Sequence, residues 1–314
     1  MQLSDRIGRR MKLQDLHILM AVVQAGSMSK AAALLNTTQP AISRSIAELE
    51  RTIGVRLLDR SPQGVEPTEY GRVLLDGGTA VFDDLRQTVK NIEFVSDPTT
   101  GEVRIGSNPS LAAGFVCAVV DQLSRRYPRI AIHLAAEQQV KTLHRELNER
   151  NVDLLIVRRF GPLADERLSF EFLFDDSFVV AAGAQSPWTR RRRIELAELA
   201  REPWTLPSAE GDTGSVATEA FRASGLDYPR MTLITNHSQV RMSLLATGRF
   251  LTILPASALR FPTRRPEIKV LPVELSKVPK PMGIVTLKNR RLSPVVELFI
   301  EHARRVARPL AKRK

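Results

Sequence analysis

The sequence lacks several features that would define a specialised class of protein. It has one cysteine, Cys117, in 314 residues, so no disulfide can form within the chain. Its 17 glycines and 19 prolines are too few for a collagenous or low-complexity chain. Apolar runs such as 178–183 are far shorter than the roughly 20 residues of a transmembrane helix, and no secretory signal pattern begins near Met1. We therefore expect a cytoplasmic protein without a membrane segment.

The usual signs of metal binding and nucleophilic catalysis are also missing. Cys117 is surrounded by valines, a pattern that predicts a core residue and not a reactive thiol. No nucleophile and base pair and no phosphate-binding loop stands out in the sequence. We therefore expect a protein that is not an enzyme and holds no cofactor. The five histidines show no metal-ligand spacing: His17, His133, His144, His237 and His302.

Length and charge suggest several domains and a polyanionic partner. A chain of 314 residues with 43% apolar residues is long enough for two or three domains. The net charge of +12 favours nucleic-acid binding. However, residues 1–95 carry 12 basic and 11 acidic side chains, so charge alone does not locate a DNA site.

Three short helices are predicted near the N-terminus. Apolar residues at i, i+3, i+4 and i+7 mark the first helix, and Gly26 ends it. Ser27 is a candidate N-cap of the second helix, over 28–35. Thr38 is the candidate N-cap of the third, whose first turn accommodates Pro40. The predicted apolar stripe of the first helix is Leu16, Leu19, Met20 and Val23.

A hairpin and a long helix follow. Two short runs flank a turn at 61–64 and predict a two-stranded wing. Residues 69–94 then predict a long helix whose apolar stripe needs a partner helix. The Gly77-Gly78 pair inside it indicates a hinge or a dependence on that partner. Residues 97–101 are the clearest linker.

Beyond Gly101 the pattern changes to short Val/Ile-rich runs that alternate with amphipathic helices, which is α/β patterning. Helices are expected over about 111–127 and 294–308, with others between most of the strands. The expected strands are 103–106, 130–134, 152–157, 177–182, 204–206, 231–234, 250–254, 268–271 and 282–287.

The segment 27–60 has the parts of a helix-turn-helix. On the third helix, Gln39, Ser43 and Arg44 share the face opposite the apolar residues, so they would project into a major groove. Gln and Arg suit this role because each can form two hydrogen bonds with a purine edge. The periodicity alone also fits a three-helix packing module with a solvated face.

These residues resemble the N-terminal winged helix-turn-helix of LysR-type transcriptional regulators. The resemblance rests on Ser27-Met28-Ser29-Lys30-Ala31-Ala32, Thr38 to Ile46, Gly54 to Arg60 and Thr68-Glu69-Tyr70-Gly71. It is highly specific over about 11–75 and extends more loosely over the whole chain, where the texture is most similar to the subgroup of the galactose-binding-protein regulator.

The resemblance implies an α+β multidomain fold. An extension at 1–10 precedes a winged helix-turn-helix at 11–70 and a dimerisation helix at 71–96. An effector-binding domain at 97–314 follows, two-lobed and of the periplasmic-binding-protein type 2 kind. Its first lobe would comprise about 101–172 and 278–310, and its second lobe about 173–277.

The resemblance also implies DNA-binding residues. Gln39, Pro40, Ser43 and Arg44 would lie near the bases, while Ser29, Thr38 and Arg60 would contact or orient on phosphate. Two positions depart from the family pattern: Leu58 replaces the usual Phe, and the wing tip lacks the Arg that many relatives insert into the minor groove. Minor-groove reading is therefore in doubt.

An effector cleft between the lobes is the second implied site. Hydroxyls and amides at helix starts suit an anion or a polyol, although Ser and Asn are also ordinary N-caps. Arg158 would supply a counter-charge. The matching positions are Ser107, Asn108, Pro109, Ser110, Glu137, Gln138, Arg158, Pro207, Ser208, Asn236, His237 and Ser238.

The sequence thus predicts a LysR-type regulator controlled by a small-molecule effector. Its expected partners are a promoter dyad in double-stranded DNA, further copies of itself as a dimer or tetramer, and RNA polymerase. One alternative is a solute-binding or enzymatic α/β protein with an N-terminal assembly module. Another is a nonspecific architectural DNA binder.

Overall fold

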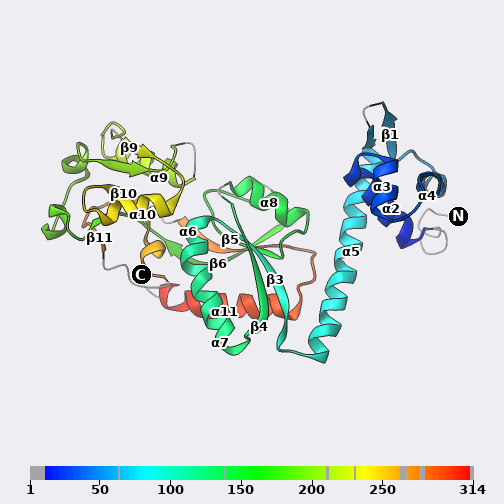
Figure 1. The fold of residues 1–314 in the computed structure, drawn as a ribbon. Coiled ribbons are helices and arrows are strands. Elements are labelled where there is room, and N and C mark those ends of the chain that lie inside the picture. Colours follow the sequence, from blue (N-terminus) through cyan, green and yellow to red (C-terminus); the bar gives the residue numbers. More distant parts are fainter. Residues whose placement is uncertain are drawn as a thin grey trace. The chain divides into compact units, whose positions relative to one another are not determined.

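The computed structural model describes residues 11–62, 64–137, 139–163, 165–209, 212–229, 231–261, 267–275 and 280–311. The expected N-terminal extension and the Gln138 site residue lie outside these ranges. The chain forms two compact units, Met1–Gln87 and Thr88–Lys314, and helix α5 (Glu69–Ser96) runs from one to the other. Figure 1 shows the helices and strands of each unit. Each unit has its own apolar core.

The N-terminal unit contains the predicted three helices and wing: α2 (Leu13–Ala25), α3 (Met28–Leu34), α4 (Gln39–Ile53), β1 (Leu58–Ser61) and β2 (Gly64–Pro67). Left-handed Gly26 ends α2, as predicted, and left-handed Gly54 ends α4. Ser27 and Thr38 occupy the N-cap positions, although neither makes a side-chain cap hydrogen bond. In α2 the structure buries Leu16 and Leu19 together with Ala21 and Val22, while Met20 and Val23 are half-buried.

The start of α5 is fixed against the segment that precedes the wing. The Thr68 hydroxyl donates to the carbonyl oxygen of Arg56 at 2.8 Å and accepts from the Gly71 N–H at 3.0 Å. A Cβ at Gly71 would lie 2.1 Å from the carbonyl oxygen of Leu57, so only glycine permits this approach.

Helix α5 runs without interruption through Gly77 and Gly78. A Cβ at Gly78 would lie 3.5 Å from the Leu16 side chain and 3.6 Å from that of Met20, so this glycine lies against α2. The helix therefore needs no hinge here. Several apolar residues of this helix remain exposed in the single chain: Val73, Val81, Leu85, Val89, Ile92 and Val95.

The C-terminal unit contains two five-stranded mixed sheets. The first has the order β4-β3-β5-β12-β6 and the second the order β11-β7-β10-β8-β9. Strands of the first are β3 (Thr100–Ser107), β4 (Arg129–Ala136), β5 (Leu154–Arg158), β6 (Leu168–Asp176) and β12 (Lys280–Leu287). Strands of the second are β7 (Phe178–Gly183), β8 (Trp204–Leu206), β9 (Met231–Ile234), β10 (Leu251–Pro255) and β11 (Ile268–Val270).

Helices pack on both faces of each sheet. On the first sheet, Phe115 and Phe299 belong to one apolar cluster, and Leu143 belongs to the cluster on the opposite face. On the second sheet, Phe221 and Leu245 belong to two separate clusters. The helices are α6 (Pro109–Leu111), a π-helix (Ala112–Val116), α7 (Cys117–Arg126), α8 (Val140–Asn148), α9 (Asp212–Ala223), α10 (Ser238–Ala246) and α11 (Pro294–Ala311). Short 3-10 helices occur at Pro187–Arg190, Leu196–Leu199 and Ala256–Leu259.

Three features differ from the sequence predictions. Strand β6 was not predicted, because a bulge opposite Met282/Gly283 breaks its alternation and leaves Phe172 exposed beside buried Leu173 and Phe174. This strand carries the first sheet to Asp176, beyond residue 172 where its lobe was expected to end. The prediction of Cys117 as a core residue is wrong, since its side chain faces outward from α7.

No helix in the described ranges is long and apolar enough to cross a bilayer.

Candidate DNA-binding surface and effector pocket

Helix α4 exposes a polar face at its N-terminal end. Gln39, Pro40 and Arg44 are exposed and Ser43 is half-buried. Ile42, Ile46 and Leu49 on the inner side are at most 1% exposed and belong to the core of the N-terminal unit. We call Gln39, Pro40, Ser43 and Arg44 the recognition face.

Polar contacts hold α4 in place from the other side. The Ser45 hydroxyl donates to the Asp15 carboxylate at 2.7 Å, which joins α4 to α2. One Glu50 carboxylate oxygen accepts the backbone N–H groups of Leu57 and Leu58, at 2.8 and 3.3 Å. These contacts anchor the helix through Ser45 and Glu50, which lie outside the recognition face.

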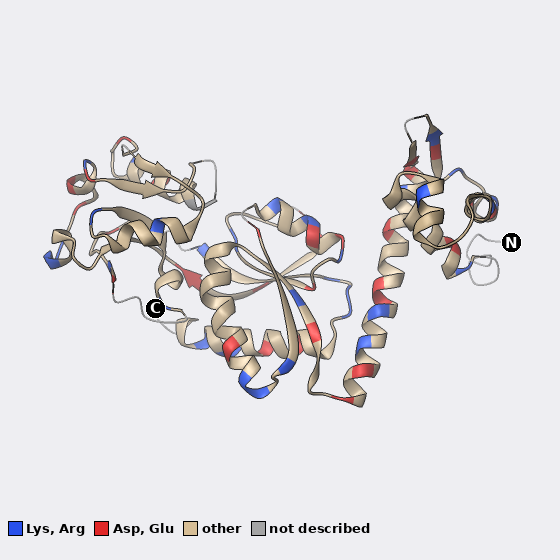
Figure 2. Ribbon diagram, in the orientation of Figure 1, with Lys and Arg blue, Asp and Glu red and all other residues tan. Residues whose placement is uncertain are grey.

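The three expected phosphate-contacting residues all lie at the surface. Ser29 is exposed in the first turn of α3, Thr38 is exposed at the N-cap of α4, and Arg60 is exposed on β1. Leu58, the departure from the family pattern, is buried and serves as a core residue. Figure 2 shows acidic residues interspersed with basic ones along α5, so this helix does not carry a purely basic stripe.

The candidate effector residues in the loop after β3 have two different roles. The Ser107 hydroxyl is buried and donates to the carbonyl oxygen of Ile156 at 2.8 Å. The Asn108 side-chain oxygen accepts from the Leu111 N–H at 3.1 Å and from the Ser110 hydroxyl at 3.0 Å. Ser107 and Asn108 therefore build the loop, and Ser110 is the one that lines a pocket.

The candidate effector residues near the second sheet also differ in whether they line the pocket. Ser238 begins α10 and lines the same pocket as Ser110. Ser208 donates its N–H to the Asn236 side-chain oxygen at 3.1 Å, while His237 is exposed and donates its N–H to Thr235. Neither Ser208 nor His237 is among the residues that line this pocket.

Arg158 lies in a buried ion pair. Its Nε donates to an Asp176 oxygen at 2.7 Å, and its two terminal nitrogens donate to the hydroxyls of Ser110 and Ser257, each at 3.2 Å. Ser257 in turn donates its hydroxyl and its N–H to Asp176, at 2.6 and 3.0 Å. The charge of Arg158 is thus compensated within the protein. Asp176 and Ser257 had no sequence signal, because only the fold brings them together.

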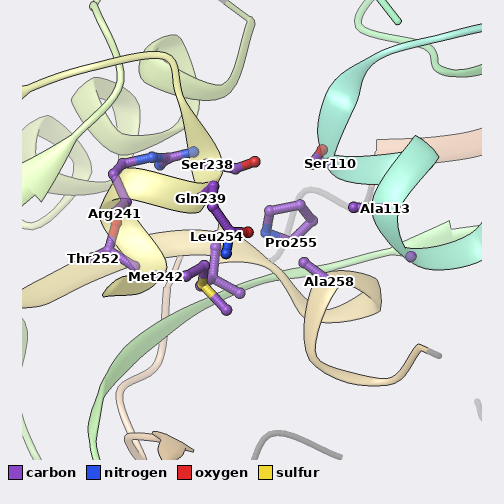
Figure 3. A pocket seen from close by; sticks show the side chains of 11 residues that line it. Ser110, Ala113, Ser238, Gln239, Arg241, Met242, Thr252, Leu254, Pro255 and Ala258 are labelled. Carbon is purple, nitrogen blue, oxygen red and sulfur yellow. The ribbon is translucent and has the colours of Figure 1, made fainter. Parts of the chain in front are cut away.

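The inter-sheet pocket, as we call it, contains about 520 Å³ of space, including the part open to solvent. Figure 3 shows Ser110 and Ser238 on opposite sides of it. Its lining comes from the segment after β3 (Ser110, Ala113, Gly114), from α10 (Ser238, Gln239, Arg241, Met242) and from β10 and the turn after it (Thr252, Leu254, Pro255, Ala258).

Arg241 is the charged pocket residue that the sequence analysis missed. It is 7% exposed, and two of its guanidinium nitrogens have no hydrogen-bond partner. Burial lowers the pKa of Arg241 to about 10. Its position one turn after Ser238 is the only sequence signal that could have suggested it. No group of three or more metal-ligating side chains occurs within the described part of the chain.

Comparisons with known proteins agree with this architecture. Residues 13–72 match the family described as "Bacterial regulatory helix-turn-helix protein, lysR family", and residues 96–308 match "LysR substrate binding domain". The transcriptional regulator YdcI of Escherichia coli K12 is 25% identical over 97% of this chain and 99% of its own length.

Solved structures show the same fold. Full-length OxyR from Pseudomonas aeruginosa has a TM-score of 0.64 and 20% identity, covering 97% of this chain and 99% of its own. Full-length CbnR in complex with its target DNA has a TM-score of 0.54 and 21% identity, covering 95% of this chain and all of its own. With both family matches in place, the chain belongs to the LysR family of bacterial DNA-binding transcriptional regulators.

Proposed function

We propose that this regulator reads specific DNA sequences through the recognition face of α4. Gln39, Pro40, Ser43 and Arg44 enter the major groove, while Ser29, Thr38 and Arg60 orient the unit on phosphates. The observation that carries this proposal is the exposed polar face on a helix whose opposite side is fully buried.

Arg44→Ala tests the proposal. Loss of a two-pronged contact with guanine costs roughly 1 to 3 kcal/mol per half-site, so discrimination between operator and random DNA should fall by at least about tenfold. Arg51→Ala is the matched control, because Arg51 is exposed two turns farther along α4 and pairs with Glu48. It should retain discrimination. Wild-type discrimination in Arg44→Ala, measured by mobility-shift competition at fixed salt, would mean that the recognition face lies elsewhere.

The domain arrangement of our proposal has a winged helix-turn-helix at 11–70, a dimerisation helix at 71–96 and an effector-binding domain from 97 onward. The exposed apolar stripe of α5 supports dimerisation, because six apolar residues in solvent favour a partner helix. One winged unit also reads few base pairs, so a dimer or tetramer on an interrupted dyad supplies the needed length. RNA polymerase is the further partner through which such a complex would act.

Effector control is the last part of the proposal. A small polar or anionic molecule in the inter-sheet pocket would favour one arrangement of the two sheets and thereby change DNA bending. A ligand shifts such an equilibrium only by its differential affinity for the two arrangements. The pocket supports this because it takes residues from segments of both sheets.

The pocket is tested by Ser110→Ala combined with Ser238→Ala, with Ser208→Ala as the control outside the pocket. The double variant should lose the effector response in operator footprints, while basal operator affinity stays within about threefold. Arg158 is unsuitable for this test because its removal would leave Asp176 without its cation. An unchanged effector response in the double variant would contradict the assignment. The finer resemblance to the galactose-binding-protein regulator subgroup stays a prediction.

A further inference from the structure

Arg241 is a buried cation that forms no ion pair with a carboxylate of the described residues. The residue is only 7% exposed, and its Nε and Nη1 atoms lack hydrogen-bond partners. Burial is the sole cause of the lowered pKa of Arg241, which at about 10 still leaves it protonated at neutral pH. A buried charge without a counter-ion is energetically unfavourable unless a ligand of opposite charge binds it.

The other buried arginines of the described chain are paired. Arg158 donates to Asp176 at 2.7 Å. Arg290 donates to Asp153 at 2.8 Å and to the carbonyl oxygen of Val152 at 2.6 Å. Arg241 differs from both, and it is the one that lines the inter-sheet pocket away from any described carboxylate. We therefore expect the anion that compensates the charge of Arg241 to bind in the pocket.

The surroundings of Arg241 combine positive potential with apolar surface. The guanidinium lies one turn into α10, whose first residues, Ser238 and Gln239, place the positive end of the helix dipole at the pocket. Met242, Leu254 and Pro255 add apolar walls. Figure 3 shows Met242 and Leu254 on the same side of the pocket as Arg241, opposite Ser110 and Ala113, with Pro255 between the two sides.

The opposite wall is irregular backbone. Ala113 and Gly114 lie in the π-helix Ala112–Val116, and a Cβ at Gly114 would lie 3.5 Å from the carbonyl oxygen of Ser257. Such π-helical turns often occur at functional sites. Small residues at these two positions keep this wall open.

The geometry points to a small organic carboxylate as the ligand of the inter-sheet pocket, with its carboxylate on Arg241 and its apolar part against Met242, Leu254 and Pro255. The planar guanidinium matches a carboxylate with two parallel hydrogen bonds. A monoanion neutralises the single uncompensated charge. A sulfate or phosphate dianion would leave excess negative charge, because the charge of Arg158 is already matched. This inference rests on the proposed effector role of the pocket.

Binding of three probes to the full-length protein without DNA tests the inference. Isobutyrate, the isosteric neutral amide isobutyramide, and sulfate are compared by calorimetry and thermal unfolding at up to about 50 mM. The wild type should bind isobutyrate at least about tenfold tighter than isobutyramide, as expected for a charge-assisted pair, and tighter than sulfate. Arg241→Met should lose the preference for isobutyrate. It should melt no lower than the wild type, because it removes an uncompensated charge from the interior.

Arg290→Met is the matched control. It should melt lower than the wild type, since it leaves the buried Asp153 without its cation, and it should keep the preference for isobutyrate. The inference is overturned if the wild type does not bind isobutyrate, binds isobutyrate and isobutyramide equally, or prefers sulfate. It is also overturned if Arg241→Met keeps the preference or melts as low as Arg290→Met.

The two proposals fail in different ways. Carboxylate binding at Arg241 without any change in operator footprints would support the site and contradict effector control. Sequence-specific operator binding by a protein that binds no carboxylate would contradict the inference and leave the DNA-binding proposal intact.

Discussion

The buried Arg158–Asp176 pair provides the sharpest stability prediction for the C-terminal unit. Both side chains are at most 2% exposed, and the carboxylate accepts three hydrogen bonds, one from Arg158 and two from Ser257. Asp176→Ala removes the acceptor and leaves the guanidinium uncompensated in the interior. The two sheets lose a contact as well, because Asp176 ends β6 and Ser257 follows β10.

The expected cost follows from this burial. Breaking a buried ion pair by removing one partner costs about 3 to 5 kcal/mol. For a unit of this size, each kcal/mol lowers the melting temperature by about 2 to 4 °C, so we expect a fall of roughly 6 to 20 °C. The double variant Arg158→Met with Asp176→Leu should recover part of this loss, because it removes both charges together.

Thermal and urea unfolding of the full-length protein measure these effects. Adding the single variants Arg158→Met and Asp176→Leu completes a double-mutant cycle, which isolates the interaction of the pair from the loss of each side chain. If Asp176→Ala costs less than about 1 kcal/mol, or if the double variant is less stable than Asp176→Ala, the reasoning about this buried pair is wrong.

Three further predictions concern other parts of the chain. Gly71→Ala should destabilise the N-terminal unit by about 1 to 3 kcal/mol, because its Cβ would clash with a backbone oxygen. Gly77→Ala lies in open space and should stabilise α5 by about 0.5 to 1 kcal/mol. Urea unfolding measures both variants, and equal effects would contradict the close approach at Gly71. Hydrogen bonds from Arg167 lower the pKa of Asp165 to about 2, so the stabilising effect of this carboxylate should be full above pH about 4 and lost as pH falls toward 2. Acid unfolding of the wild type and of Asp165→Asn measures this effect. A constant difference in stability between the two proteins across that range would refute the prediction. Leu85→Glu should shift the protein toward monomers in sedimentation at micromolar concentration, because Leu85 is 44% exposed on the apolar stripe of α5, and an unchanged mass would count against dimerisation through this helix.

Local patterns in the sequence were enough to predict the N-terminal unit. Helix caps, short spacing and apolar periodicity act over a few residues, so the three helices, the wing and α5 were expected close to their observed bounds. Most strands of the C-terminal unit were also expected. Strand β6 was missed because its bulge disrupts the alternation that marks a strand.

Features that depend on tertiary packing could not be predicted. Valine neighbours suggested a buried Cys117, yet its position on α7 points it outward, because burial depends on which helical face meets the sheet. Arg158 was expected to face an effector, and the fold instead places Asp176 beside it. Arg241 had no sequence motif, since the burial of its guanidinium without hydrogen-bond partners for Nε and Nη1 arises only when α10 packs against the second sheet.

The most direct test of the central claim is a genome-wide footprint of the full-length protein at fixed salt, compared with that of Arg44→Ala. Sequence-specific reading through α4 predicts discrete wild-type sites that share an interrupted dyad with half-sites spaced by whole helical turns, and their loss in Arg44→Ala. Uniform occupancy without a shared dyad, or an identical set of sites in both proteins, would contradict the account.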